Sequence, residues 1–333
     1  MKMQIRNRGG ALCALLMTTV CSCNSNGNNQ TAAVALKAYV GLFGDKAVAV
    51  IDTSTNQVTN TIPVPTGPHG LVVTPDGAKV FVSSDGSSTV SVIATASDTV
   101  IASVDVGMTP HGLSISSDGK RVVCAGYGTD SVQVIDSATN QVVTRVAVPR
   151  PHNSTISPDG KLAYVGSQQK DTPSIAVVDL DAGSVIASVP LANPPRALDF
   201  ASAGTVYFTV GGLDVLESLD PVTGQLAATP IATGGSPHHM IATKDGAFEL
   251  VVSQTVGDLE YVDATTRAVT AQVPTGMTPH WIARSPDGGR AYVTNEGSNT
   301  VSVVDLAQRT VVATIPVGNG PRKIAVQPVV AGP

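Results

Sequence analysis

A proline followed by a histidine or an arginine occupies seven positions spaced 41 to 44 residues apart in this 333-residue chain. Five of the six histidines occupy this position, and the sixth, His239, directly follows one of them. Imidazoles bind zinc, copper and iron, and guanidinium groups pair with carboxylates and phosphates. The candidate binding residues are His69, His111, His152, Arg196, His238, His239, His280, Arg322 and the only tryptophan, Trp281, which follows His280.

Four short segments of β character follow each proline. The first commonly ends at an Asp-Gly pair, as at residues 118–119 and 287–288. Such a pair favours a hairpin, because glycine readily adopts the positive φ that a tight turn requires. The fourth segment alternates threonine and valine, which is typical of a half-exposed outer strand. The repeat predicts an all-β fold, a seven-bladed β-propeller of four-stranded antiparallel blades.

The two ends of the repeat region predict how the ring closes. Residues 37–41 have the pattern of a second strand, whereas residues 323–327 have the pattern of a first strand. We therefore expect the C-terminal strand to complete the N-terminal blade, which leaves no open sheet edge at either end. This arrangement places the propeller at residues 37–329.

One segment carries a family resemblance. Residues 292–295 read YVTN and residues 297–305 read GSNTVSVVD. They resemble the repeat of YVTN-family seven-bladed β-propellers, in the lactonase-like and cytochrome d1-like superfamily. The resemblance implies the same fold over residues 37–329. It does not define one activity, because such propellers include lactonase-like enzymes, haem or copper enzymes and surface binding proteins.

Strand direction sorts the loops onto two faces of the predicted ring. The Pro-His/Arg positions open the innermost strands, so they surround one mouth of the central channel. The turns between second and third strands lie on the same face and include Asp45, Asp85, Asp130, Gln168, Gln169, Lys170, Asp171, Asp214, Gln254, Asn295 and Glu296. The aspartates that end the third segments lie on the opposite face, where we expect them to cap turns.

Three uses of the histidine positions remain open at this stage. His69, His111, His152, His238 and His280 could bind a metal ion, with zinc, copper or iron as the candidates. Alternatively, the imidazoles and arginines could form a metal-free pocket for a small anionic ligand or for catalysis. The histidines could instead hydrogen-bond a neighbouring turn and help the blades to pack.

The N-terminus has the pattern of an export signal. Basic residues precede a short apolar stretch at residues 11–20, and the following Val-Cys-Ser-Cys resembles a bacterial lipoprotein signal with Cys23 as the lipidated residue. We therefore predict a signal peptide at residues 1–22, a polar tether at residues 23–36, and a lipoprotein on the periplasmic face of the envelope or on the cell surface. Cys124, in an apolar segment, is predicted to be a buried hydrophobic residue.

The charge balance narrows the choice of partners. Three of the 20 basic residues and none of the 25 acidic residues lie in residues 1–22, so the remainder is acidic. This balance disfavours binding to nucleic acid, and membrane contact is expected only through the lipid. We predict a monomeric, lipid-anchored protein that binds a small ligand, a metal or a protein partner at the channel mouth. The alternative is an envelope enzyme of the lactonase-like hydrolase or metal-dependent lyase or oxidase type.

Overall fold

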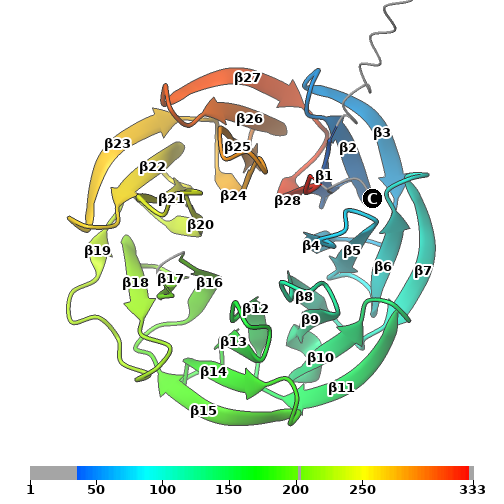
Figure 1. The fold of residues 1–333 in the computed structure, drawn as a ribbon, viewed down its shortest axis with the longest axis vertical. Coiled ribbons are helices and arrows are strands. Elements are labelled where there is room, and N and C mark those ends of the chain that lie inside the picture. Colours follow the sequence, from blue (N-terminus) through cyan, green and yellow to red (C-terminus); the bar gives the residue numbers. More distant parts are fainter. Residues whose placement is uncertain (1–35, 202–203, 330–333) are drawn as a thin grey trace, which may run out of the picture. The chain divides into compact units, whose positions relative to one another are not determined.

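The computed structural model describes residues 36–201 and 204–329, which form seven four-stranded antiparallel sheets around a central axis (Figure 1). The innermost strands are β28 (Pro321–Val326), β4 (Pro68–Val73), β8 (Pro110–Ile115), β12 (Pro151–Ile156), β16 (Pro195–Phe200), β20 (Pro237–Ala242) and β24 (Pro279–Arg284). The second strands are β1 (Lys37–Leu42), β5 (Lys79–Ser84), β9 (Arg121–Gly126), β13 (Leu162–Ser167), β17 (Val206–Val210), β21 (Phe248–Ser253) and β25 (Arg290–Asn295).

The outer half of each blade consists of a third and a fourth strand. The third strands are β2 (Ala47–Asp52), β6 (Thr89–Ala94), β10 (Ser131–Asp136), β14 (Ser174–Asp179), β18 (Val215–Leu219), β22 (Asp258–Asp263) and β26 (Thr300–Asp305). The outermost strands are β3 (Gln57–Pro63), β7 (Thr99–Asp105), β11 (Gln141–Ala147), β15 (Ser184–Pro190), β19 (Ile231–Ala232), β23 (Ala268–Pro274) and β27 (Thr310–Pro316). The predicted seven-bladed, all-β fold is confirmed.

The described residues contain a single short helix, η1 (Tyr127–Thr129), in the turn between β9 and β10. None of their helices has the length and apolar character needed to cross a membrane. The predicted signal peptide, the lipidated Cys23 and nearly all of the tether lie outside the described residues.

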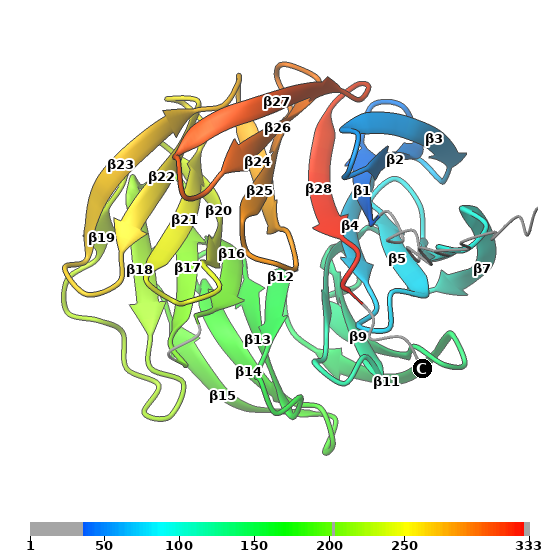
Figure 2. The same cartoon turned by 45° about the horizontal axis from the view of Figure 1, so that its top comes forward.

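The ring closes as the sequence predicts. β28 pairs antiparallel with β1, with Val40 opposite Ile324, and Figure 2 shows β28 in red beside β1 in blue. Beyond the paired strands, the backbone N–H of Gln327 donates to the carbonyl of Lys37 at 2.8 Å. The N-terminal blade therefore contains both the first and the last strand of the described chain, and its inner edge is covered.

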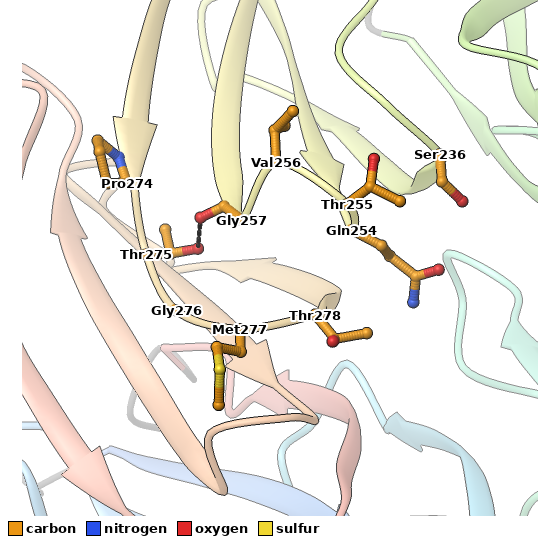
Figure 3. A pocket seen from close by; sticks show the side chains of 10 residues that line it. All are labelled: Ser236, Gln254, Thr255, Val256, Gly257, Pro274, Thr275, Gly276, Met277 and Thr278. Atoms are coloured by element: carbon orange, nitrogen blue, oxygen red, sulfur yellow. Dashed lines mark hydrogen bonds between the residues drawn. The ribbon is translucent and has the colours of Figure 1, made fainter.

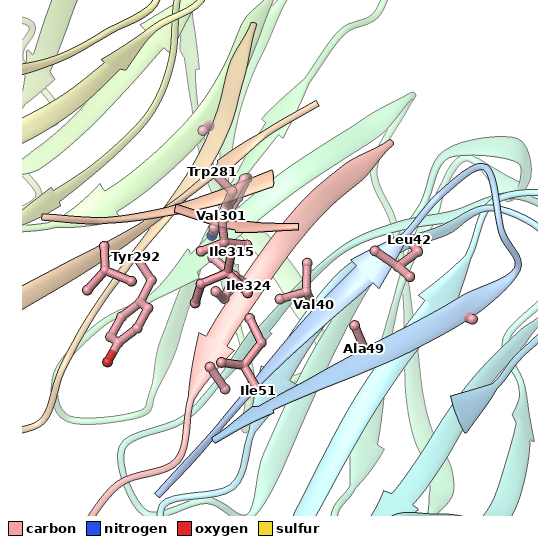
Figure 4. Close-up of a cluster of buried hydrophobic side chains, with 13 residues drawn as sticks. Val40, Leu42, Ala49, Ile51, Trp281, Tyr292, Val301, Ile315 and Ile324 are labelled. Carbon is pink, nitrogen blue, oxygen red and sulfur yellow. The ribbon is translucent and has the colours of Figure 1, made fainter. Parts of the chain in front are cut away.

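Apolar side chains between neighbouring blades form the core. At the closing interface Val40, Ile51, Tyr292 and Ile324 are buried together (Figure 4). Full burial of one such side chain contributes about 1.5–3 kcal/mol relative to its exposed state. Second and third strands are buried almost throughout, whereas β27 alternates exposed and buried positions, as expected for an outer strand.

Turn chemistry explains the recurring aspartates. Asp305 Oδ1 accepts the backbone N–H groups of Ala307 and Gln308 at 3.0 and 2.8 Å, and the equivalent aspartates of other blades do the same. Gly119 and Gly288, the glycines of two Asp-Gly turns, have φ values of 73° and 83°. These residues therefore shape the scaffold. Cys124 is fully buried in β9, as predicted.

Candidate functional site

A β-bulge lies at the start of the innermost strand in every blade. The register of β4 with β5 shifts between Pro68 and Leu71, and the six other innermost strands shift at the equivalent place. A bulge leaves one residue without a cross-strand partner and redirects its side chain. In β20 and β24 the residue without a partner is the histidine after the proline, because Pro237 and His239, and likewise Pro279 and Trp281, keep their cross-strand partners.

Five imidazoles meet at the channel mouth; we call His69, His111, His152, His238 and His280 the imidazole cluster. The ring centroids of His69 and His111 are 3.8 Å apart, and those of His111 and His152 are 4.0 Å apart. His238 and His280 are separated by 3.9 Å. His69 and His280 come from blades separated by β28, yet their centroids are only 5.7 Å apart. The imidazoles therefore lie near the axis and fill the mouth.

The two arginines that interrupt the histidine series bond to loop residues at the edge of this cluster. The Arg322 guanidinium lies over the Phe43 ring, 3.5 Å from its centroid, and its Nε donates to Glu296 Oε1 at 3.0 Å. One Nη of Arg196 donates to Ser236 Oγ at 3.1 Å. Nearby loop residues therefore hold each guanidinium, and the imidazoles occupy the space near the axis.

Hydrogen bonds fix the ring orientation of only two imidazoles. His111 Nδ1 donates to the carbonyl of His152 at 3.0 Å, and His152 Nδ1 donates to the carbonyl of Arg196 at 2.9 Å. Donation through Nδ1 leaves the Nε2 lone pair available to a metal ion. In the part of the chain that the structure describes, the buried Nδ1 atoms of His69, His238 and His280 have no hydrogen-bond partner. A purely structural hydrogen-bonding role therefore accounts for His111 and His152 but leaves the other three unexplained.

Burial keeps the cluster uncharged. It lowers the pKa of His152 to about 4 and that of His238 to about 3, and nearby arginines reinforce both shifts. Burial and repulsion from neighbouring imidazoles hold the pKa values of His69, His111 and His280 well below the usual range. Neutral imidazoles are the form that binds metal ions.

A carboxyl group from a neighbouring turn completes a possible ligand set. Asp85 Oδ2 lies 3.8 Å from His111 Nε2. One ligand atom each from His69, Asp85 and His111 lie within 4.8 Å of one another. Burial raises the pKa of Asp85 to about 7, although the Arg322 guanidinium opposes the shift. Sequence analysis placed Asp85 on this face but assigned it no role, because the spacing does not show which turn approaches which histidine.

The remaining candidates, His239 and Trp281, lie deeper in the channel. Their rings stack at a centroid distance of 3.5 Å with an interplanar angle of 15°. Both side chains line the channel below the mouth. The bulge explains the difference, since it directs His238 to the mouth and leaves His239 at the next inward-facing position of β20.

The same face carries a separate surface hollow of about 760 Å³ between the β21–β22 turn and the β23–β24 loop (Figure 3). Polar groups at its edge include Gln254 and Thr275, whose hydroxyl donates to the Gly257 carbonyl at 3.1 Å. None of its lining residues is acidic, basic or a histidine. It offers contact area but lacks the chemistry of the imidazole cluster.

These features define a class of protein: a seven-bladed β-propeller whose channel mouth is filled by imidazoles. The sequence matches the YNCE-like β-propeller family over residues 1–328, and the chain belongs to that family. No curated protein matches the sequence.

Solved structures share the fold at low identity. The chain is 23% identical to Kuenenia stuttgartiensis hydrazine synthase, with a TM-score of 0.74 over 81% of this chain and 92% of that one. A putative 6-phosphogluconolactonase from Bacteroides uniformis is 18% identical, with a TM-score of 0.70 over 87% and 99%. The dihydro-haem d1 dehydrogenase NirN is 18% identical, with a TM-score of 0.65 over 86% and 74%. At these identities the likeness concerns the fold, which serves several chemistries.

Proposed function

We propose that this protein is an exported, lipid-anchored propeller whose imidazole cluster binds a divalent transition-metal ion. His69, Asp85 and His111 are the primary ligands, and His152, His238 and His280 lie beside them. The observation that carries the proposal is the convergence of these three ligand atoms within 4.8 Å beside imidazole nitrogens that lack hydrogen-bond partners among the described residues.

The spacing of the ligand atoms supports this reading. Donor atoms of a tetrahedral zinc site, each about 2.0–2.2 Å from the ion, are about 3.4 Å apart. His111 and Asp85 are already separated by 3.8 Å. Small side-chain rotations would bring the third atom into range. Two imidazoles and one carboxylate suit zinc or iron, and additional imidazoles would suit copper.

Elemental analysis of untagged protein, followed by calorimetric titration with Zn²⁺, Cu²⁺ and Fe²⁺, tests the proposal. We expect one ion per chain and at least tenfold weaker binding after Asp85→Asn. Asp130→Asn is the matched control, because Asp130 occupies the equivalent turn of the next blade and accepts the N–H of Arg150 at 2.9 Å. Substoichiometric metal, or equal affinities for the two variants, would refute the proposal.

A metal-dependent enzyme is the second candidate. The number of primary ligands favours an enzyme, because three protein ligands leave a coordination position open for water or substrate. Zinc held by these residues would lower the pKa of a water molecule, and hydroxide able to attack an ester or lactone would then be available near neutral pH. Hydrolysis of a simple lactone by the metal-loaded protein, lost on Asp85→Asn, supports this candidate, and metal binding without turnover supports the binding protein.

The cellular setting is part of the proposal. Export and a lipid on Cys23 would place the propeller at the periplasmic face of the envelope or on the cell surface. The acidic composition favours a metal ion, a small ligand or a protein partner over nucleic acid. A monomer is proposed, because the ring closes within one chain through the pairing of β28 with β1.

A further inference from the structure

The central channel below the imidazole cluster contains an open pocket of about 540 Å³, which we call the channel cavity. Its walls are mainly aliphatic and come from all seven innermost strands, and its far end reaches the turns that follow β8 and β12. Ligand pockets for small molecules commonly have this size and apolar character.

Two cationic side chains line the channel cavity. Lys323 on β28 is 8% exposed, and its Nζ crosses the channel to donate to the carbonyl of Leu113 on β8 at 2.6 Å. Its ammonium group also lies 4.4 Å from the centroid of the Trp281 ring. Arg284 on β24 donates to the carbonyl of Ala242 at 2.5 Å. Among residues 36–201 and 204–329, neither cation has a carboxylate oxygen within 4.0 Å.

A buried cation without a paired carboxylate is costly, and here the carboxyl groups that face the cations are poor counterions. Burial raises the pKa of Asp199 on β16 to about 6 and that of Glu249 on β21 to about 8. Burial lowers the pKa of Lys323 to about 7, although Asp199 opposes the shift. An anion that entered the cavity would supply the missing pairing.

The three bulky side chains that narrow the channel below the mouth come from consecutive blades. His239, Trp281 and Lys323 occupy the position two residues after the proline, where the other four blades have Gly70, Gly112, Asn153 and Ala197. The stacked His239 and Trp281 rings form one flat aromatic wall. Hydroxyl groups of Ser114 and Ser154, hydrogen-bonded to each other at 2.7 Å, also line the cavity. The cavity thus combines cations with an aromatic surface and an aliphatic body.

We propose that the channel cavity binds a small organic anion with a carboxylate head and an apolar body. Lys323 binds the carboxylate, Arg284 adds a second positive charge on the channel wall, and the His239–Trp281 stack and the aliphatic walls contact the apolar body. This site is separate from the proposed metal site and does not depend on it.

Trp281 provides the readout, because it is the only tryptophan of the chain and lines the cavity. Protein freed of metal by chelation and dialysis is titrated at pH 6.5 with benzoate, hexanoate, benzamide and benzylamine. Saturable fluorescence changes are expected with the two carboxylates. The affinity for neutral benzamide should be at least tenfold lower, and cationic benzylamine should cause no change. A charged hydrogen bond typically contributes 1.5–3 kcal/mol, which corresponds to about 10- to 100-fold in affinity.

Variants separate the cations from the rest of the cavity. Lys323→Met and Arg284→Met should each weaken benzoate binding tenfold or more. Lys79→Met is the matched control, because Lys79 also donates to a backbone carbonyl, that of Ser137 at 2.7 Å, but lies outside the cavity. No saturable response to either carboxylate at millimolar concentration, equal binding of benzoate and benzamide, or unchanged binding by Lys323→Met would each overturn the proposal. Because the titrations are metal-free, none of these outcomes depends on the imidazole cluster.

Discussion

Replacement of Lys323 by methionine should stabilise the protein by an amount that depends on pH. Methionine has a similar length and removes the ammonium group that burial in the channel disfavours. The pKa of Lys323 falls from 10.5 to about 7 on folding, mainly through burial. At 1.36 kcal/mol for each tenfold change in proton affinity, this displacement corresponds to a penalty of about 5 kcal/mol.

The pH range over which the stability difference changes follows from the protons that Lys323 binds in the folded and unfolded states. Below pH 7 the lysine is protonated in the folded and unfolded states, so the full penalty is present. Between pH 7 and 10.5 the unfolded state binds more protons, so the stability of the wild type rises with pH. The advantage of Lys323→Met should therefore be largest at pH 6, about 5 kcal/mol as a ceiling, and should shrink towards zero by pH 10.5.

Urea unfolding of both proteins from pH 6 to pH 10.5, in buffers without carboxylates, measures this difference. The titratable groups that interact with the lysine, Asp199 and His239, are common to both proteins. Lys79→Met should show no comparable gain at pH 6. A difference between the wild type and Lys323→Met that stays constant across the pH range would refute the reasoning.

Three further predictions concern other parts of the molecule. Zinc at 100 times its dissociation constant should stabilise the folded protein by about 2.7 kcal/mol, and at the same zinc concentration the tenfold or weaker binding by Asp85→Asn should reduce this gain to about 1.4 kcal/mol or less, with a smaller rise in Tm. Gly112→Ala should cost about 1–3 kcal/mol in urea unfolding, because its Cβ would lie 2.7 Å from the carbonyl oxygen of His152, whereas Gly211→Ala meets only ordinary contacts; equal losses would contradict this. Cys23→Ser should release the protein from membranes in cell fractionation, and continued membrane retention would exclude lipidation at that residue.

The period of the sequence was sufficient to predict the architecture. The seven prolines define seven innermost strands, and the Asp-Gly pairs define the hairpins that follow them. The closing pair of β28 and β1 could be inferred because the chain starts on a second strand and ends on a first. These features depend on local turn chemistry and on strand order, and both can be inferred from a sequence.

The site was harder to predict, because it depends on where side chains point. Alternation along a strand does not reveal the bulge that directs His238 to the mouth and leaves His239 in the channel. Nor does it show that Arg196 and Arg322 bond to loop residues at the edge of the imidazole cluster. Lys323 was overlooked, although a signal existed: the residue two positions after the proline is glycine, asparagine or alanine in four blades and bulkier in three consecutive ones. A repeat alignment compared column by column would have singled out that position.

The pairing of β28 with β1 also sets an order of assembly. A hydrogen bond at this junction joins Lys37 and Gln327, which are 290 positions apart in the chain. Among the described strands β28 is the last along the chain, and it carries both Arg322 and Lys323. A growing chain that has completed the other six blades therefore still lacks one wall of the channel and one of its two cavity cations. The proposed capture of an anion in the channel therefore requires the completed ring.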